Sequence, residues 1–452
     1  MITTRIPLAD LADREQPSVI RCELEHLSND AGAQLLRALS VIGDEEKLRI
    51  ASDEFGGHCL ALTLLGSYLT DAHNGDIRCR KEIRLGHDVR QGVHARRVME
   101  SYQNWLGEGP ELSVLRLGLF DRPADEKALG AVLKPPVIHG LTEPLTDLSP
   151  TEWRAILARL RRAGLLAGED PHNPGDLDTH SLVREYFGEQ LRSQRTEAWK
   201  EGNRRLYEYY QTIAPQLPNN FREMEPLFLA VICACNVGLY REALHQVYIP
   251  RLQRGKACFA ANILGARGAL LTVLGHFFAR GRWGSPVEMA VAGQNLTAED
   301  QLFLLMQAAL YLTATRGLAS TEAKTCYERA ESLCHSLHRP LLLYSTLISQ
   351  WRYSFVTEKL TATMQIAQRI YSLAQKQNDP ASIMGACSAL AANHCYLGDD
   401  FETARKYALR GVEIWRSGRV QTPIDEMMAS PVVCLIYEAL SEWFRRGRLQ
   451  PG

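Results

Sequence analysis

The stretch that decides the fold runs from Pro380 to Trp415 and reads PASIMGACSALAANHCYLGDDFETARKYALRGVEIW. Its first half places small and apolar residues at helical spacing, and Gly398-Asp399-Asp400 then interrupts the pattern with a turn. Its second half resumes the helical spacing, and the small residues allow two helices to approach closely. The stretch therefore predicts a helical hairpin. The residues expected to face one another are Ala386, Ala389, Leu390 and Asn393 on the first helix and Ala404, Tyr407, Ala408 and Val412 on the second.

The same arrangement recurs upstream in the chain. Ala323, Thr363 and Ala404 stand at equivalent positions, and the differences between their numbers give spacings of 40 and 41 residues. Tetratricopeptide repeats have a spacing of about 34 residues, so the pattern predicts elongated helix pairs that resemble this repeat type. Residues 236–244 resemble the turn and the second-helix opening of such a repeat, and residues 430–446 predict a further first helix. We therefore expect an α-solenoid.

A second helical region lies between residues 111 and 195 and contains a well-marked helix start. Ser149 is placed as the N-cap, Pro150 occupies the first helical position, and Glu152 falls three residues after the cap, as in a capping box. The apolar residues that follow recur at helical spacing and predict one buried face. Two prolines within residues 168–175 predict a loop or a small β wing. The residues expected on the buried face are Trp153, Ile156, Leu157, Leu160 and Leu165.

Residues 178–187, which follow this region, read Asp-Thr-His-Ser-Leu-Val-Arg-Glu-Tyr-Phe. They resemble the nucleotide-sensing motif that closes the winged-helix subdomain of the signal-transduction ATPases with numerous domains, the NB-ARC-like STAND family. In that family the histidine of the motif touches the β-phosphate of bound ADP, and the closed, inactive state depends on it. The resemblance implies this role for His180.

Two further landmarks fit the same family. The first five residues end in Thr-Thr-Arg, which resembles the strand end whose arginine senses the γ-phosphate; the resemblance implies that role for Arg5. An arginine suits the task because its guanidinium stays charged and pairs bidentately with phosphate oxygens. Residues 56–62 resemble the Gly-Gly-x-Pro-Leu-Ala-Leu element that contacts adenine, which implies nucleotide contacts for Gly57 and Cys59. Cys59 replaces the family's proline, so the sequence departs from the pattern at that contact. Residues 24–36 predict the first helix between these landmarks.

The phosphate-binding loop of the family does not occur in the 452 residues. Such a loop reads G-x-x-x-x-G-K-[ST], and its backbone N–H groups and lysine hold the phosphates. The pair Gly255-Lys256 has Pro250 where the first glycine belongs and Ala257 where the hydroxyl residue belongs. We therefore expect the regulatory part of such an ATPase, with its ATP-binding core missing. On this interpretation the chain is not an enzyme, and it binds ADP or ATP only where a nucleotide-binding core is supplied.

The amino-acid composition bears on whether the chain binds nucleic acid, membranes or metals, and on its cellular compartment. Lys and Arg total 51 against 52 Asp and Glu, so no overall basic field favours nucleic acid or a membrane surface. The eleven cysteines include no C-x-x-C pair and no zinc-motif spacing, which predicts free thiols in a reducing compartment and no metal. The chain shows neither a secretory signal nor an uninterrupted run of 18 apolar residues. We therefore expect a cytoplasmic protein that does not bind membranes.

Two other interpretations stay open at this point. A basic run extends from Arg78 to Arg97, and the predicted helix after Ser149 carries four arginines. Winged helices of transcription factors place such a helix in the major groove of DNA. The chain would then be a DNA-binding transcriptional regulator with the repeats as its effector domain. Alternatively it is a plain repeat scaffold in which the sensor motifs are relics. The sensor motif directly after the helix favours the ATPase-regulatory interpretation, in which DNA binding is not expected.

The resulting prediction is a mainly α chain made of a small helical subdomain, a winged-helix subdomain with a small β wing, and an α-solenoid of TPR-like helical hairpins. The expected partners are a protein or peptide trigger on the repeat surface and a separate NTPase or effector module. The expected segments are 1–72 (end of a nucleotide-binding core and helical subdomain), 73–110 (basic linker and helix), 111–195 (winged helix), 196–295 (helical region with degenerate repeats) and 296–452 (TPR-like repeats).

Overall fold

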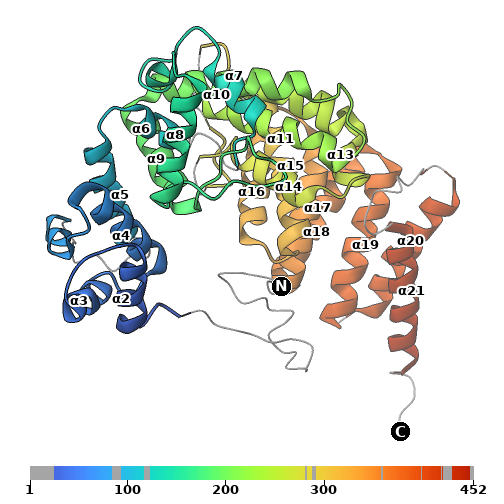
Figure 1. Ribbon diagram of the computed structural model, residues 1–452. Helices are drawn as coiled ribbons and strands as arrows, with labels where there is room; N and C mark the ends of the chain where they lie inside the picture. The colour runs from blue at the N-terminus through green and yellow to red at the C-terminus, as the bar shows by residue number, and fades with distance from the viewer. Residues whose placement is uncertain are drawn as a thin grey trace. The chain divides into compact units, whose positions relative to one another are not determined.

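The computed structural model describes residues 25–83, 93–116, 123–279, 282–287, 292–357, 360–398, 400–418, 420 and 430–447. All regular secondary structure in these ranges is helical (Figure 1), which confirms the mainly α prediction. The chain divides into two compact units, Met1–Gly202 (unit 1) and Asn203–Gly452 (unit 2). Within the described ranges, no helix is both long enough and apolar enough to span a membrane.

Short helices joined by tight turns build unit 1. Its first described helix, α2 (Asn29–Ala38), starts where the Ser28 hydroxyl accepts the backbone N–H of Ala31 at 3.2 Å. The helix predicted for residues 24–36 therefore begins only at Asn29, because this cap fixes its start. The other elements are α3 (Glu45–Glu54), α4 (Cys59–His73), η1 (Ile77–Glu82), α5 (Val93–Leu106), α6 (Pro110–Arg116), α7 (Glu126–Leu133), η3 (Glu143–Leu145), α8 (Pro150–Arg162) and α9 (Ser181–Gln194).

The start of α8 has the predicted capping box. The Ser149 hydroxyl accepts the backbone N–H of Glu152 at 3.2 Å, and the Glu152 carboxylate accepts the backbone N–H of Ser149 at 2.9 Å. Two backbone N–H groups at the start of α8 are thereby paired. The predicted apolar face is also present: Ile156, Leu157, Leu160 and Leu165 are buried, and Trp153 is half-buried.

The β wing predicted within residues 168–175 is not formed, since the structure has no strand in this part of its range 123–279. The loop instead makes an isolated bridge between Asp170 and Asn173. The Asp170 carboxylate accepts the backbone N–H of His172 at 2.9 Å and the Asn173 side-chain N–H at 3.1 Å. These local bonds close a turn, and the two prolines of the loop have no N–H to donate to a ladder. The wing is therefore a loop.

Unit 2 begins inside α10 (Thr196–Ile213), which the boundary between the units crosses. The turn predicted after residue 236 is present between α11 (Phe221–Asn236) and α12 (Tyr240–Glu242), and α12 continues as the π-helix η4 (Ala243–Gln253). The buried Arg251 of η4 donates to the backbone oxygens of Ala214 and Pro215, each at 3.0 Å. It thereby satisfies carbonyl groups just beyond α10. The short elements that follow are η5 (Gly255–Ala257), α13 (Phe259–Asn262) and α14 (Arg267–Gly275).

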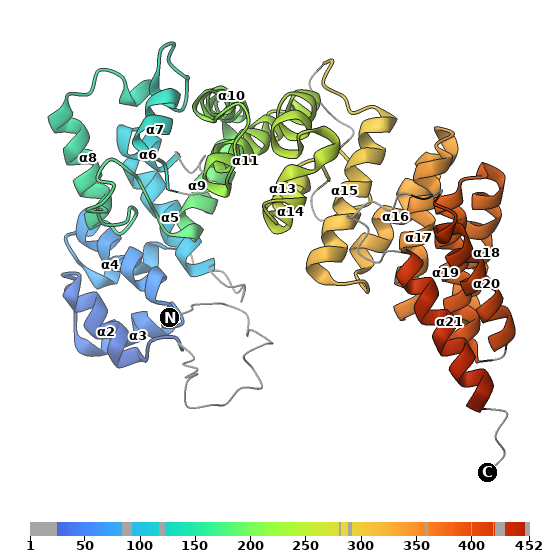
Figure 2. The ribbon, with the colours of Figure 1, turned by 90° about the vertical axis from the view of Figure 1, so that its right-hand side faces the viewer.

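The rest of unit 2 consists of consecutive helix pairs, as predicted (Figures 1 and 2). Ala323, Thr363 and Ala404 lie near the starts of the second helices and are 2%, 0% and 0% exposed. Helices of 16 to 19 residues joined by short turns account for the long repeat spacing. The pairs are α15 (Ala298–Arg316) with α16 (Thr321–Ser336), α17 (Pro340–Thr357) with α18 (Leu360–Gln377), and α19 (Pro380–Leu397) with α20 (Phe401–Arg416); α21 (Ser430–Gly447) packs against α19 and α20.

The hairpin formed by α19 and α20 buries the predicted residues. Asn393, fully buried, accepts the indole N–H of Trp351 at 2.7 Å and donates to the backbone oxygen of Leu360 at 3.1 Å. These two bonds link α19 to the preceding helix pair and satisfy a polar side chain inside the core. The predicted facing residues Ala386, Ala389, Leu390, Ala404, Ala408 and Val412 are buried, and Tyr407 is half-buried.

Gly411 marks a close approach of α20 and α21. A Cβ atom at this position would lie 2.3 Å from Sγ of Cys434. We expect Gly411→Ala to lower the free energy of unfolding by about 1–2 kcal/mol, because the extra methyl group overpacks the contact. Urea denaturation of the single variants and of the Gly411→Ala, Cys434→Ala double variant measures this. The double variant should lose less free energy of unfolding than the sum of the two single losses, since removing the sulfur makes room for the methyl group. If the two losses simply add, the side chains of residues 411 and 434 do not interact as proposed.

Candidate functional site

The turn between α3 and α4 is built from two glycines with left-handed backbone. Gly56 and Gly57 both have φ of +62°. Gly57 donates its N–H to the backbone oxygen of Ser52 and accepts the N–H of Leu27, each at 2.9 Å. A Cβ atom on Gly57 would lie 2.1 Å from the backbone oxygen of Leu27, so only glycine permits this approach. The turn therefore holds the segment that precedes α2 against the start of α4.

His58 and His26 lie at this turn. His58 is the N-cap of α4, and its Nδ1 accepts the backbone N–H of Ala61 at 3.3 Å. His26 lies with its Nδ1 2.7 Å from the backbone oxygen of Gly56, the distance of a donated hydrogen bond. The two imidazole rings meet edge to face with centroids 5.6 Å apart. Cys59, the first residue of α4, is exposed.

His180 occupies the corresponding position at the start of α9. Its Nδ1 accepts the backbone N–H of Leu182 at 3.2 Å, and its side chain is exposed. Both α4 and α9 thus begin with a histidine that accepts at Nδ1. In the neutral form of such an imidazole the proton is on Nε2, so Nε2 is a donor.

The helix α5 lies against both α4 and α9 (Figure 2). Arg96 of α5 ties it to α9 by donating to Glu185 at 2.8 Å and to Glu189 at 3.1 Å. His94, the second residue of α5, has its ring centroid 5.8 Å from that of Phe55. Its Nδ1 is buried and makes no hydrogen bond within the described part of the chain.

The side chains of His26, His58, His94 and His180 form what we call the histidine cluster. Burial lowers the pKa of His58 below its ordinary value of 6.5, and His26, His180 and His94 lower it further by charge repulsion. His58 is therefore neutral at pH 7. Because the unfolded chain takes up a proton at this position more readily, the contribution of His58 to stability decreases as the pH falls through 6.5.

His58, His94 and His180 stand at or next to the amino ends of α4, α5 and α9. An α-helix carries a partial positive charge and unpaired backbone N–H groups at this end, which favours anionic ligands. The Nε2 donors of His58 and His180 add to this preference. The site therefore suits an anionic group such as a phosphate.

The structure brings together only part of the site predicted from sequence. Gly57 lies in the turn before His58, Cys59 follows it, and His180 lies near enough to His58 to lower its pKa. Arg5 lies outside the described residues. Sequence reasoning missed His26, His58 and His94, since single histidines on three separate elements form no pattern along the chain.

The chain was compared with protein-family models, curated proteins and solved structures. No protein-family model matches the chain, and no curated protein matches it. Among solved structures, it is similar to a STAND protein with a tetratricopeptide repeat sensor from Pyrococcus horikoshii, with a TM-score of 0.34 and 14% sequence identity. The similarity covers 92% of this chain and 57% of that protein, so the chain matches less than two thirds of its length.

Proposed function

We propose that the chain is the regulatory and sensor arm of a STAND-type signalling ATPase. In this role unit 1 holds an ADP-bound resting state through His180, and the helix pairs of unit 2 bind a protein or peptide trigger. The observation that carries the proposal is the proximity of His180 to the turn at Gly56 and Gly57. His180 lies far along the sequence from this turn, yet it belongs to the histidine cluster together with His58, which directly follows the turn.

The cap at the start of α9 gives His180 a defined role in this proposal. Because its Nδ1 accepts from Leu182, the neutral imidazole carries its proton on Nε2 and donates from there to a phosphate oxygen. A hydrogen bond to a charged group is worth roughly 1.5–3 kcal/mol. Gly57 and Cys59 would lie on the adenine side, as the family resemblance implies, and Arg5 would sense the γ-phosphate.

In this proposal the nucleotide binds to a complex of the chain with a separate nucleotide-binding core. The 452 residues contain no phosphate-binding loop, so ADP or ATP would bind where a separate nucleotide-binding core meets unit 1. The chain itself would catalyse no reaction. Its task would be to favour one state of the core over another.

An aromatic row on unit 2 supports the binding of a protein trigger. Trp351, Phe355, Tyr396 and Tyr437 follow one another across α17, α19 and α21, with ring centroids 5.1, 5.3 and 6.2 Å apart. Tyr396 is 58% exposed. Aromatic side chains are enriched at protein interfaces because they offer a large contact area with few rotatable bonds. The trigger shifts the population only if it binds the open, oligomerising state better than the closed one.

Two of the four arginines of α8 weigh against the DNA-binding alternative. Arg159 donates to Glu111 at 2.8 Å and lies over the ring of Trp105, 4.7 Å from its centroid. Arg161 donates to Glu169 at 3.2 Å. Side chains that pair with acids of their own chain are not available to phosphates without losing these contacts. We therefore do not propose DNA binding.

Binding measurements on the purified 452-residue chain test the proposal. We expect no ATP hydrolysis, and no binding of ADP or ATP in the micromolar range by isothermal titration calorimetry, because the phosphate loop is missing. A micromolar Kd for ADP would show that the chain builds the site without a partner. Association with duplex DNA should be weak and salt-sensitive; sequence-specific binding at physiological salt would favour the transcriptional regulator instead.

A further inference from the structure

A second cluster of ionisable side chains lies at the other end of α4. We propose that His73, Cys79 and Glu82 bind a divalent transition-metal ion, with zinc as the metal that fits the ligand set best. The site is separate from the histidine cluster and does not depend on nucleotide binding.

The geometry of the three side chains is close to that of a metal site. One nitrogen of His73, Sγ of Cys79 and one carboxylate oxygen of Glu82 all lie within 4.8 Å of one another. Nε2 of His73 is 3.8 Å from Oε2 of Glu82. In tetrahedral zinc sites the bonds of about 2.0–2.3 Å place neighbouring ligand atoms roughly 3.3–3.8 Å apart. Small side-chain rotations are therefore enough to complete the site.

The conformation of the backbone brings His73 close to Cys79 and Glu82. α4 ends at His73, and Asn74 and Gly75 adopt left-handed conformations that turn the chain back. Ile42 fixes this turn, since it donates to Gly75 at 2.7 Å and accepts from Ile77 at 3.1 Å.

The conformation of η1 adds the other two ligands. η1 (Ile77–Glu82) is a 3₁₀-helix, in which residues i and i+3 lie on the same side. Cys79 and Glu82 are three apart and therefore face the end of α4 together. A metal ion would connect α4 to η1 at this point.

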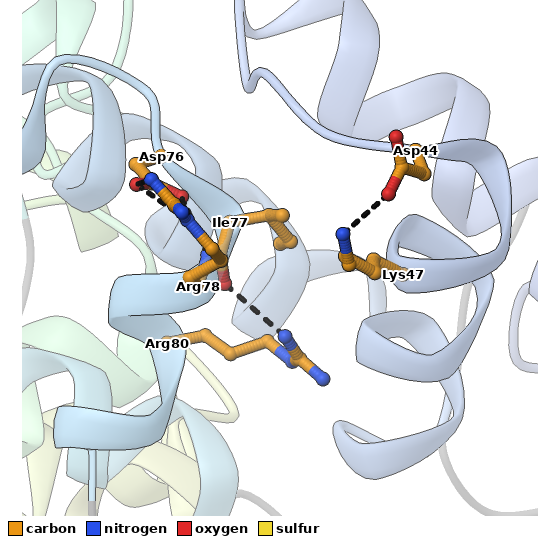
Figure 3. A network of polar contacts seen from close by, with 6 residues as sticks. All are labelled: Asp44, Lys47, Asp76, Ile77, Arg78 and Arg80. Atoms are coloured by element: carbon orange, nitrogen blue, oxygen red, sulfur yellow. Dashed lines mark hydrogen bonds and ion pairs between the residues drawn. The ribbon is translucent and has the colours of Figure 1, made fainter.

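The arginines of η1 do not prevent a cation from binding here by charge repulsion, because acidic side chains of the chain pair with them. Arg78 donates to both carboxylate oxygens of Asp76, and these bonds hold the pKa of Asp76 at about 2. Arg80, only 6% exposed, donates to Glu54 at 2.7 Å and to the backbone oxygen of Ile77 at 3.2 Å. Figure 3 shows Arg78 beside Asp76 and Arg80 directed toward Ile77, while Lys47 pairs separately with Asp44.

The ligand chemistry selects the metal. An imidazole, a thiolate and a carboxylate form the mixed N, S, O set of zinc, whereas calcium and magnesium prefer oxygen ligands alone. Three protein ligands leave one coordination position for a water molecule. The Tyr68 hydroxyl lies 3.3 Å from Nε2 of His73, and metal binding through Nε2 would replace this hydrogen bond.

Proton balance gives the site a defined pH dependence. Cys79 coordinates a metal ion only as the thiolate. Binding forms the metal–sulfur bond and releases the thiol proton to solvent, so the affinity for metal increases with pH.

Cobalt(II) titration of the full chain tests the proposal, because cobalt occupies zinc sites and its thiolate complexes absorb light. We expect one equivalent of cobalt to give a sulfur-to-cobalt charge-transfer band, which zinc then abolishes. Zinc at about 100 times its Kd should raise the Tm of unit 1 by roughly 5–10 °C. Cys79→Ser should remove the band, and Glu82→Gln should weaken cobalt binding by at least about ten-fold.

Cys258→Ser is the matched control, since Cys258 is another half-buried thiol, in unit 2, and should leave the band unchanged. The Tm of metal-free Cys79→Ser and Glu82→Gln shows whether the variants are folded. A wild-type chain without a charge-transfer band overturns the proposal, as does a band that persists in Cys79→Ser. Unchanged cobalt affinity in Glu82→Gln removes Glu82 from the ligand set and overturns the three-ligand site.

Discussion

Gly57→Ala is expected to lower the free energy of unfolding of unit 1 by about 3 kcal/mol or more. Two costs add at this position. A non-glycine residue at φ of +62° costs about 1–2 kcal/mol. The new Cβ would also lie 2.1 Å from the backbone oxygen of Leu27, and a backbone atom cannot move aside as a flexible side chain can. The segment before α2 would have to leave the turn, and His26 would move with it.

Gly56→Ala provides the matched control for this experiment. Gly56 has the same φ of +62°, but a Cβ atom there would meet nothing within 4 Å. We expect it to cost only about 1–2 kcal/mol, the conformational part alone. Urea denaturation followed by circular dichroism measures both variants. The difference between the two losses in free energy of unfolding is the cost of the clash with the backbone oxygen of Leu27. Equal losses would show that this close contact contributes nothing.

The second large effect concerns His180 in a complex with a nucleotide-binding core. Both His180→Ala and His180→Asn should weaken ADP binding by about ten- to a hundred-fold, because each removes the Nε2 donor. The two variants differ in the isolated chain. His180→Ala also removes the cap of α9 and should cost about 0.5–2 kcal/mol, whereas asparagine is a good N-cap and should preserve stability.

This pair of variants separates the two roles of His180. The measurements are the Tm of the isolated chain and the Kd for ADP of the chain combined with a core that carries a phosphate-binding loop. If His180→Asn keeps the wild-type ADP affinity while His180→Ala loses it, His180 acts as a helix cap only. The sensor role would then be wrong, although the fold would stand.

Much of the fold followed from local patterns. The hairpin of residues 380–415 was predicted because its small and apolar residues recur at helical spacing and Gly398 ends the first helix; the structure places that glycine at φ of +70° as the cap. The capping box at Ser149 was predictable for the same reason, since a cap involves residues only three apart. The prediction of a β wing was wrong, because local hydrogen bonds of Asp170 and two prolines competed with strand pairing. The composition of the loop alone did not reveal this competition.

The sites depended on contacts that no local pattern encodes. The sequence by itself determined the helical hairpin of residues 380–415 and the capping box at Ser149, because each rests on neighbours within a few residues. The recurrence of the pattern determined the repeat spacing, and the family resemblance supplied the candidates Gly57, Cys59 and His180. Only the tertiary structure decided that four histidines share one environment, and that His73 meets Cys79 and Glu82. Packing of α5 against α4 and α9 produced the first cluster, and a left-handed turn followed by a 3₁₀-helix produced the second. Proximity between separate elements depends on how their buried faces fit together, and that fit exists only once the chain has folded.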